Sequence, residues 1–166
     1  MQNSNKMVYI DNPYKNIDQN RLIKLTDFII SYFSLSNKEI SISFVNDRQM
    51  RELNKKYRNI DRTTDVLSFA LSEGEDNFDD TMLGDIIISY DTAQKQAESL
   101  NHPLFIENDN LLCHSMLHLL GYDHIEISDR KIMFEQHRKI LNEFYRLTED
   151  SEYINDEWLM GENTDG

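Results

Sequence analysis

Cysteine, proline and glycine are scarce in this chain of 166 residues, which has one Cys, two Pro and five Gly. The single cysteine, Cys113, excludes an intramolecular disulfide and is typical of a reducing compartment. The low Pro and Gly content excludes collagen-like and Pro-rich chains. The best apolar run, residues 28–33, is far shorter than the roughly 20 residues that span a bilayer, and residues 1–10 lack a signal-peptide pattern. We therefore expect a cytoplasmic protein without membrane contact.

Positive charge is also in short supply. The chain has 17 Lys and Arg against 30 Asp and Glu, a formal net charge of −13, whereas a nucleic-acid-binding domain is usually basic. Five acids lie within residues 73–80 and seven within residues 149–166, where like charges favour a solvated loop and a solvated tail. Hydrophobic residues make up 39% of the chain, enough for a core. We expect one domain over residues 1–148 and an acidic C-terminal tail over residues 149–166.

The basic residues are concentrated in one window. Residues 48–62 contain six Lys or Arg, against only Glu52 and Asp61. Taken alone, this window favours an exposed helix face. In an acidic chain it is also the one segment that would attract rather than repel a polyanion.

Residue periodicity predicts strands and helices in a mixed order. Strict alternation over residues 40–44 indicates a half-buried strand, and apolar spacings of three and four over residues 19–33 indicate a helix with Asp18 as its N-cap. Further strands are expected at residues 7–10, 65–71 and 84–90. Further helices are expected after Asn46 or Asp47 and over residues 91–100, 105–120 and 128–145, the last of them capped by Ser128.

The helix after Asn46 or Asp47 is expected to turn Met50, Leu53 and Tyr57 inward. Together the elements predict an α+β fold: a single domain in which a small, mixed, four-stranded sheet packs with about five helices.

Three of the five histidines lie in the pattern His114-x3-His118-x2-Gly121-x2-His124. On a helix, His114 and His118 stand one turn apart on the same face. Gly121 can end the helix in the left-handed conformation, which lets His124 return to the same point. Three imidazoles with an open fourth position are typical of a catalytic zinc site. Nitrogen ligands also accept other divalent transition metals.

The remaining candidate ligands have weaker support. His102 and His137 have no partner at ligand spacing, so we interpret both as structural. Cys113 points about 100° away from His114 around the helix, which favours a small buried side chain over a fourth ligand.

A catalytic metal makes hydrolysis the default reaction class, because it lowers the pKa of a bound water to about 7. The histidine spacing matches the metzincin proteases except at Ser115, where those enzymes have the glutamate general base. The loss of that Glu argues against proteolysis, although a carboxylate elsewhere in the fold could replace it.

The segment from His114 to His124 resembles the signature of the YbeY family of metal-dependent bacterial endoribonucleases. Three further blocks occur in the family's order: Leu53-Asn54-x2-Tyr57-Arg58, Thr64-Asp65-Val66-Leu67-Ser68-Phe69 and Gly84-Asp85-Ile86-x-Ile88-Ser89. The resemblance extends over residues 40–146. The family usually has Gly in place of Ser115 and Pro in place of Ala70.

This resemblance implies a cytoplasmic, zinc-dependent, single-strand endoribonuclease with a metzincin-like site and one metal ion per chain. Its substrate would be ribosomal RNA, notably the 3′ end of the small-subunit RNA, and its partners ribosome components, with a link to ribosome quality control. By the same resemblance, His114, His118 and His124 are the metal ligands and Arg58 assists catalysis.

Physical chemistry supports part of this implication. A guanidinium can bind two oxygens of a phosphodiester as negative charge develops there. Arg58 could equally form a surface salt bridge with Asp61. Asp65 and Asp85 at strand starts are not assigned as bases, and Asp123 is either a turn residue or a support for a ligand histidine.

Two other functions remain open. One is a metalloprotease-like hydrolase, which would require a carboxylate near the open metal position. The other is a non-catalytic, ribosome-associated protein that keeps the metal for stability.

Overall fold

The computed structural model describes residues 8–35, 37–70, 82–122 and 126–154. Within these ranges the elements are β1 (Val8–Asp11), α1 (Gln19–Tyr32), β2 (Glu39–Val45), α2 (Asp47–Arg58), β3 (Val66–Ala70), β4 (Met82–Ser89), α3 (Tyr90–Leu100), α4 (Leu104–Leu119), α5 (Ile127–Leu147) and a 3-10 helix at Ser151–Tyr153. The prediction of a small α+β domain with a mixed four-stranded sheet and about five helices is confirmed.

The strands are arranged in the order β1-β2-β4-β3. β1, β2 and β4 run parallel, whereas β3 pairs antiparallel with β4. A parallel pair needs a crossover connection, and α1 supplies the one between β1 and β2. In the described part of the chain, β3 is therefore an edge strand whose outer side remains available to other elements.

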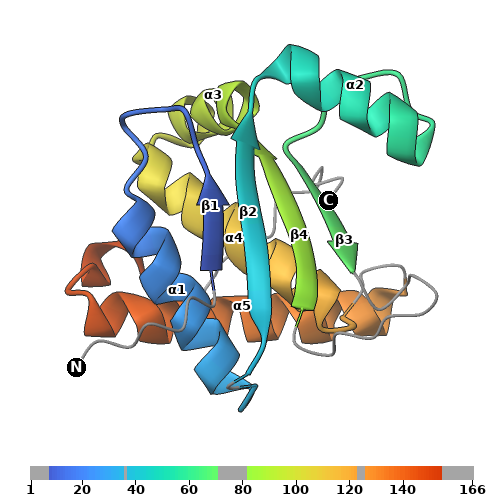
Figure 1. The fold of residues 1–166 in the computed structure, drawn as a ribbon. Helices are drawn as coiled ribbons and strands as arrows, with labels where there is room; N and C mark the ends of the chain where they lie inside the picture. Colours follow the sequence, from blue (N-terminus) through green and yellow to red (C-terminus); the bar gives the residue numbers. More distant parts are fainter. Residues whose placement is uncertain (1–7, 36, 71–81, 123–125, 155–166) are drawn as a thin grey trace.

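The helices α1 and α4 lie against one face of the sheet, and α5 packs on these two helices (Figure 1). Alternation in β2 turns Ile40, Ile42 and Phe44 into this core, where they are buried. α4 is buried almost all round, because it contacts the sheet as well as α1, α3 and α5. The helix that carries the histidine motif is thus the central helix of the domain.

Two of the N-caps predicted from the sequence are confirmed, and a third is wrong. The Asp18 carboxylate accepts a hydrogen bond from the Arg21 amide, and Asn46 and Gln49 form a reciprocal capping box at the start of α2. The prediction of Ser128 as the cap of the last helix is wrong, because α5 already begins at Ile127 after Glu126.

The predicted inner face of α2 is correct for Met50, which is buried, and wrong for Tyr57, which is 53% exposed. Asn54 takes the inward position instead and donates a hydrogen bond to the Arg62 carbonyl at 2.9 Å. Figure 1 shows the reason: α2 lies at one end of the sheet and extends away from α1, α4 and α5, so its last turn has little core to cover.

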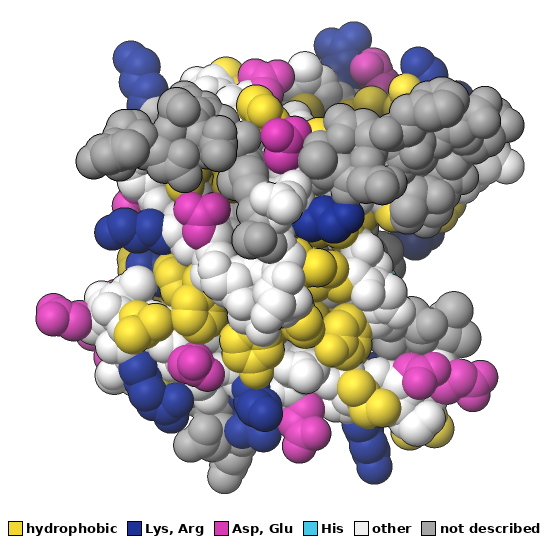
Figure 2. All heavy atoms as spheres, turned by 60° about the horizontal axis from the view of Figure 1, so that its bottom comes forward, with side chains coloured by type: hydrophobic (Ala, Val, Ile, Leu, Met, Phe, Trp, Pro, Cys, Tyr) yellow, Lys and Arg dark blue, Asp and Glu magenta, His cyan; other side chains and the backbone are white. Residues whose placement is uncertain are grey.

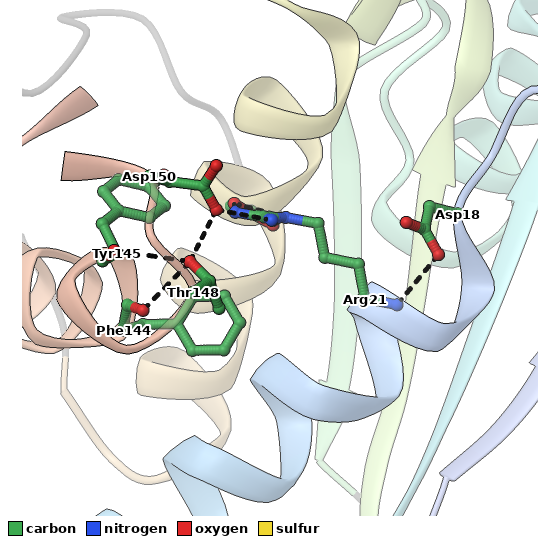
Figure 3. Close-up of polar contacts among 7 residues, drawn as sticks. Asp18, Arg21, Phe144, Tyr145, Thr148 and Asp150 are labelled. Atoms are coloured by element: carbon green, nitrogen blue, oxygen red, sulfur yellow. Dashed lines mark hydrogen bonds and ion pairs between the residues drawn. The ribbon is translucent and has the colours of Figure 1, made fainter. Parts of the chain in front are cut away.

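A buried ion pair fixes α4 in place. Arg21 extends from α1 toward the segment that follows α5 (Figure 3). Its guanidinium donates to both carboxylate oxygens of the fully buried Asp109 on α4, at 2.7 to 3.1 Å, and to Asp150 at 3.0 Å. The Phe105 ring lies 4.5 Å from the guanidinium carbon. One side chain therefore ties together α1, α4 and the first residues of the predicted acidic tail.

Among the described residues, no helix is both long enough and apolar enough to span a membrane.

Candidate active site

The two helical histidines of the motif lie together on α4. The ring centroids of His114 and His118 are 4.6 Å apart, and the ring planes meet at 83°. His114 is only 2% exposed, whereas His118 lines a surface pocket. Neighbouring imidazoles on consecutive turns are suited to a shared transition-metal ion, since each offers one nitrogen lone pair.

α4 ends at Leu119, and Gly121 follows its C-cap residue Leu120, as the sequence predicts. Gly121 has a φ of +103°, and its amide donates to the His118 carbonyl at 3.0 Å, as part of a Schellman turn. The third predicted ligand, His124, and its neighbour Asp123 lie outside the described residues. Within the described ranges, no three His, Cys, Asp or Glu side chains converge on a common point.

A pocket of about 360 Å³ connects α4 with the basic helix. Its lining comes from the end of α2, the loop after it, β3 and the end of α4, and consists of Asn54, Arg58, Ile60, Arg62, Thr64, Leu67, Ser68, Ala70, His118 and Leu119. The fold thus brings the predicted catalytic arginine and one predicted metal ligand to the same pocket.

β3 holds the Arg58 side chain. Arg58 Nη2 donates to the Ser68 carbonyl at 2.8 Å, and the guanidinium carbon lies 4.7 Å from the centroid of the Phe69 ring. The alternative salt bridge with Asp61 is absent, because Asp61 instead accepts from Arg51 at 2.8 Å. Arg58 is therefore oriented by neutral partners, which leaves its positive charge available to an anion.

The lining residues favour an anionic ligand. Arg58 and Arg62 contribute two guanidinium groups, and none of the described lining residues is Asp or Glu. On the face that Figure 2 shows, Lys and Arg side chains are instead interspersed with acidic ones around exposed hydrophobic side chains. The described lining of this pocket therefore differs in charge from that face.

Close packing sets the position of α4 beside this pocket. A Cβ atom on Gly84 of β4 would overlap the Phe69 carbonyl oxygen and would lie 2.9 Å from Cδ2 of Leu119. Glycine at this position therefore allows α4 to approach the sheet directly next to His118.

A family model described as "Endoribonuclease YbeY" matches residues 6–145. This chain belongs to the YbeY family. Proteins named endoribonuclease YbeY are 48% identical over 118 residues in Heliobacterium modesticaldum, 38% over 150 residues in Thermoanaerobacter pseudethanolicus and 35% over 162 residues in Clostridium botulinum.

These matches cover 66%, 81% and 83% of this chain and 71%, 94% and 98% of the respective relatives. A solution structure from Thermotoga maritima has a TM-score of 0.61 and 26% identity, and the match covers 92% of this chain and all of that one. The family resemblance and the enzyme class predicted from the sequence, an endoribonuclease, are confirmed by these relatives.

The structure of this YbeY-family chain also locates the residues that the sequence does not assign as ligands or catalytic groups. His102 contacts the Glu107 carboxylate at 2.8 Å near the start of α4, which is a structural role. Cys113 is fully buried, and burial raises the pKa of its thiol. Asp65 is buried and accepts hydrogen bonds from Thr64 and Gln96. These residues do not line the pocket, and neither do Asp85 and the fully buried Ser115.

His137 is the site neighbour that spacing does not reveal. It lies on α5, is 3% exposed, and its ring centroid is 6.4 Å from that of His114. Burial lowers its pKa to about 3, so the ring is neutral at physiological pH. Because α5 reaches His114 only through tertiary packing, no periodic pattern within the motif could have identified this contact.

Proposed function

We propose that this chain is a metal-dependent endoribonuclease that cleaves single-stranded ribosomal RNA during maturation, notably at the 3′ end of the small-subunit RNA. The observation that carries the proposal is the shared pocket of Arg58 and His118, which combines a phosphate-binding group with a metal-ligand group. The names of the relatives support RNA as the substrate class.

Arg58 binds the scissile phosphodiester in this proposal. Its planar fork donates to two nonbridging oxygens and stabilises the negative charge that builds up on them as the bond breaks. The Ser68 carbonyl and the Phe69 ring hold the guanidinium in place before RNA arrives. Little side-chain entropy is then lost on binding, and Arg62 adds a second positive charge at the same pocket.

The described residues fit a resident metal ion. The closely placed imidazoles of His114 and His118 form a nitrogen donor pair, and His124 is the proposed third ligand. We propose zinc, one ion per chain, with another divalent transition metal as the alternative. When bound, the metal would act as a Lewis acid toward the reacting oxygens.

The two histidines of the donor pair have different surroundings. His114 lies in the core against His137, which restricts its ring, while His118 faces the pocket. The pair therefore combines a rigid inner ligand with an outer ligand that meets the substrate side. We further propose a cytoplasmic location, with ribosome components as partners and a role in ribosome quality control.

A peptidase is less compatible with the pocket. Peptide hydrolysis needs a group that delivers a proton to the amine leaving group, usually a carboxylate near the metal. The described lining contains no carboxylate, and Ser115, which occupies the position of the protease glutamate, is buried away from the pocket. Two arginines instead suit a phosphodiester.

The proposal is tested by incubating the purified protein with a labelled single-stranded fragment from the 3′ end of small-subunit rRNA. We expect the wild type to cleave the fragment and His114→Ala to lose this activity. His102→Ala is the matched control, because His102 precedes α4, lies outside the histidine motif, and its Nε2 contacts the Glu107 carboxylate.

Two results would reject the proposed function. One is an inactive wild type with its full metal content, and the other is equal cleavage by the wild type and His114→Ala. RNA binding without cleavage by the metal-loaded wild type would favour the non-catalytic ribosome-associated function.

A further inference from the structure

The exposed ring of Tyr57 contacts the same Phe69 ring as the guanidinium of Arg58, the arginine that lines the pocket. Tyr57 is 53% exposed, in the last turn of a helix whose apolar pattern predicts an inward position. An exposed aromatic ring loses hydrophobic stabilisation unless something covers it. Its place next to Arg58 suggests that the covering group belongs to the substrate.

Tyr57 is held rather than left to rotate freely. Its ring meets the half-buried Phe69 ring edge to face, with centroids 5.5 Å apart and an interplanar angle of 66°. The Phe69 ring also lies beneath the Arg58 guanidinium. One side chain of β3 therefore supports both the tyrosine and the arginine, and fixes their relative position.

The surroundings of Tyr57 are cationic. Lys56 Nζ lies 5.1 Å from the centroid of the Tyr57 ring, and Lys55 and Arg58 are exposed in the same turn. In the described part of the chain, these three cations form no ion pair with a carboxylate. An aromatic ring among available cations favours a nucleobase with its phosphate over an apolar protein side chain.

We infer that Tyr57 is a base-stacking subsite for single-stranded RNA, which binds the nucleotide next to the phosphate held by Arg58. The inference rests on the proposed function and extends it by assigning a residue to an unpaired base. An unpaired base can stack on an aromatic ring, whereas a base within a duplex is already stacked on its neighbours. The subsite therefore selects single-stranded RNA without reading its sequence.

The test measures binding of a fluorescein-labelled, single-stranded rRNA fragment by stopped-flow anisotropy before cleavage proceeds. Tyr57→Ala should weaken binding by about 5- to 150-fold, the range for one lost base–aromatic stack. Tyr57→Trp and Tyr57→Phe should keep binding within a few-fold of the wild type. Tyr57→Leu keeps an apolar contact to Phe69 but lacks a π face, so it should bind as weakly as Tyr57→Ala.

Tyr9→Ala is the matched control, because Tyr9 is 47% exposed on β1, the opposite edge strand of the sheet. This variant should bind RNA like the wild type. Thermal unfolding of each variant establishes whether the domain is intact.

An abasic scan of the RNA separates stacking from an indirect effect on Arg58. Replacing the nucleotides one at a time should reveal one position at which the abasic fragment binds the wild type as weakly as intact RNA binds Tyr57→Ala. At that position the two changes together should cost no more than either alone.

Additive losses at every position, or normal binding by Tyr57→Leu, would overturn the inference. The proposed function can fail independently of this inference. A wild type that binds RNA through Tyr57 but never cleaves it would reject the nuclease function and support the stacking subsite. Normal cleavage by a Tyr57→Ala variant with unchanged RNA affinity would support the nuclease function and reject the stacking subsite.

Discussion

Arg58 and His118 come from different helices and line the same pocket at the outer edge of β3. Arg58 is the last residue of α2, and His118 lies in the last turn of α4. β3 connects them, because it holds the guanidinium through Ser68 and Phe69 and contacts α4. The geometry of the site therefore depends on how this strand packs on α4.

Loss of the Arg58 guanidinium should impair cleavage without unfolding the protein. Arg58→Ala is expected to lower kcat by roughly 10²- to 10³-fold, the usual cost of removing one charge-stabilising donor. Arg58→Lys should fall between this variant and the wild type, because an ammonium keeps the charge but not the planar fork. Single-turnover cleavage of the rRNA fragment measures both effects.

Arg48→Ala is the control for Arg58, since Arg48 lies on the same helix and pairs only weakly with Glu52 at 3.8 Å. Its cleavage rate should match that of the wild type. Equal losses in the two variants would mean that α2 contributes only diffuse positive charge.

Removal of one motif histidine should abolish stoichiometric metal binding. His118→Ala is expected to weaken metal affinity by more than about 100-fold, beyond the 10- to 100-fold cost of losing a group that merely supports a ligand. Native mass spectrometry reports the metal content. Added zinc should raise the Tm of the wild type and of His102→Ala, but not that of His118→Ala, because only a bound ion stabilises the folded state. An unchanged zinc response in His118→Ala would place the metal elsewhere.

Local patterns predicted most of the elements, because the apolar periods and the caps at Asp18, Asn46 and Gly121 act within a few residues of the chain. The features that the sequence did not reveal depend on tertiary packing. Tyr57 follows a helical period, yet α2 extends past the core that would cover it. His137 approaches His114 only because α5 packs on α4. The predicted site joins two motifs, and the fold shows that Arg58 and His118 line the same pocket.

Gly84 should be intolerant of even one added methyl group. Gly84→Ala is expected to destabilise the fold by about 1–3 kcal/mol, because the new Cβ overlaps a backbone oxygen that cannot move aside as a side chain could. Relief of this overlap would shift β3 or Leu119, so cleavage should fall further than the loss of stability explains. Urea unfolding and single-turnover cleavage give the two measurements. Ser43→Ala on β2, which adds no atoms, should change neither.

The Arg21–Asp109 pair should make stability depend on pH once the arginine is removed. Burial raises the pKa of Asp109 to about 6 in the native protein, while Arg21 acts to lower it. Arg21→Met removes that opposing effect, so the folded pKa of Asp109 rises further above its unfolded value near 4. A carboxyl with a raised folded pKa stabilises the fold while protonated, and this stabilisation is lost as pH rises through the folded pKa.

Arg21→Met should therefore cost about 3–5 kcal/mol at pH 8, where an ionised Asp109 would be buried without its partner, and less at pH 5, where the carboxyl is protonated. Urea unfolding of the variant and the wild type at the two pH values measures the difference. Arg48→Met, whose side chain is 89% exposed in the native protein, should stay within about 0.5 kcal/mol of the wild type at both. A cost for Arg21→Met that does not change with pH would show that lost packing on Phe105, rather than an isolated buried charge, accounts for the destabilisation.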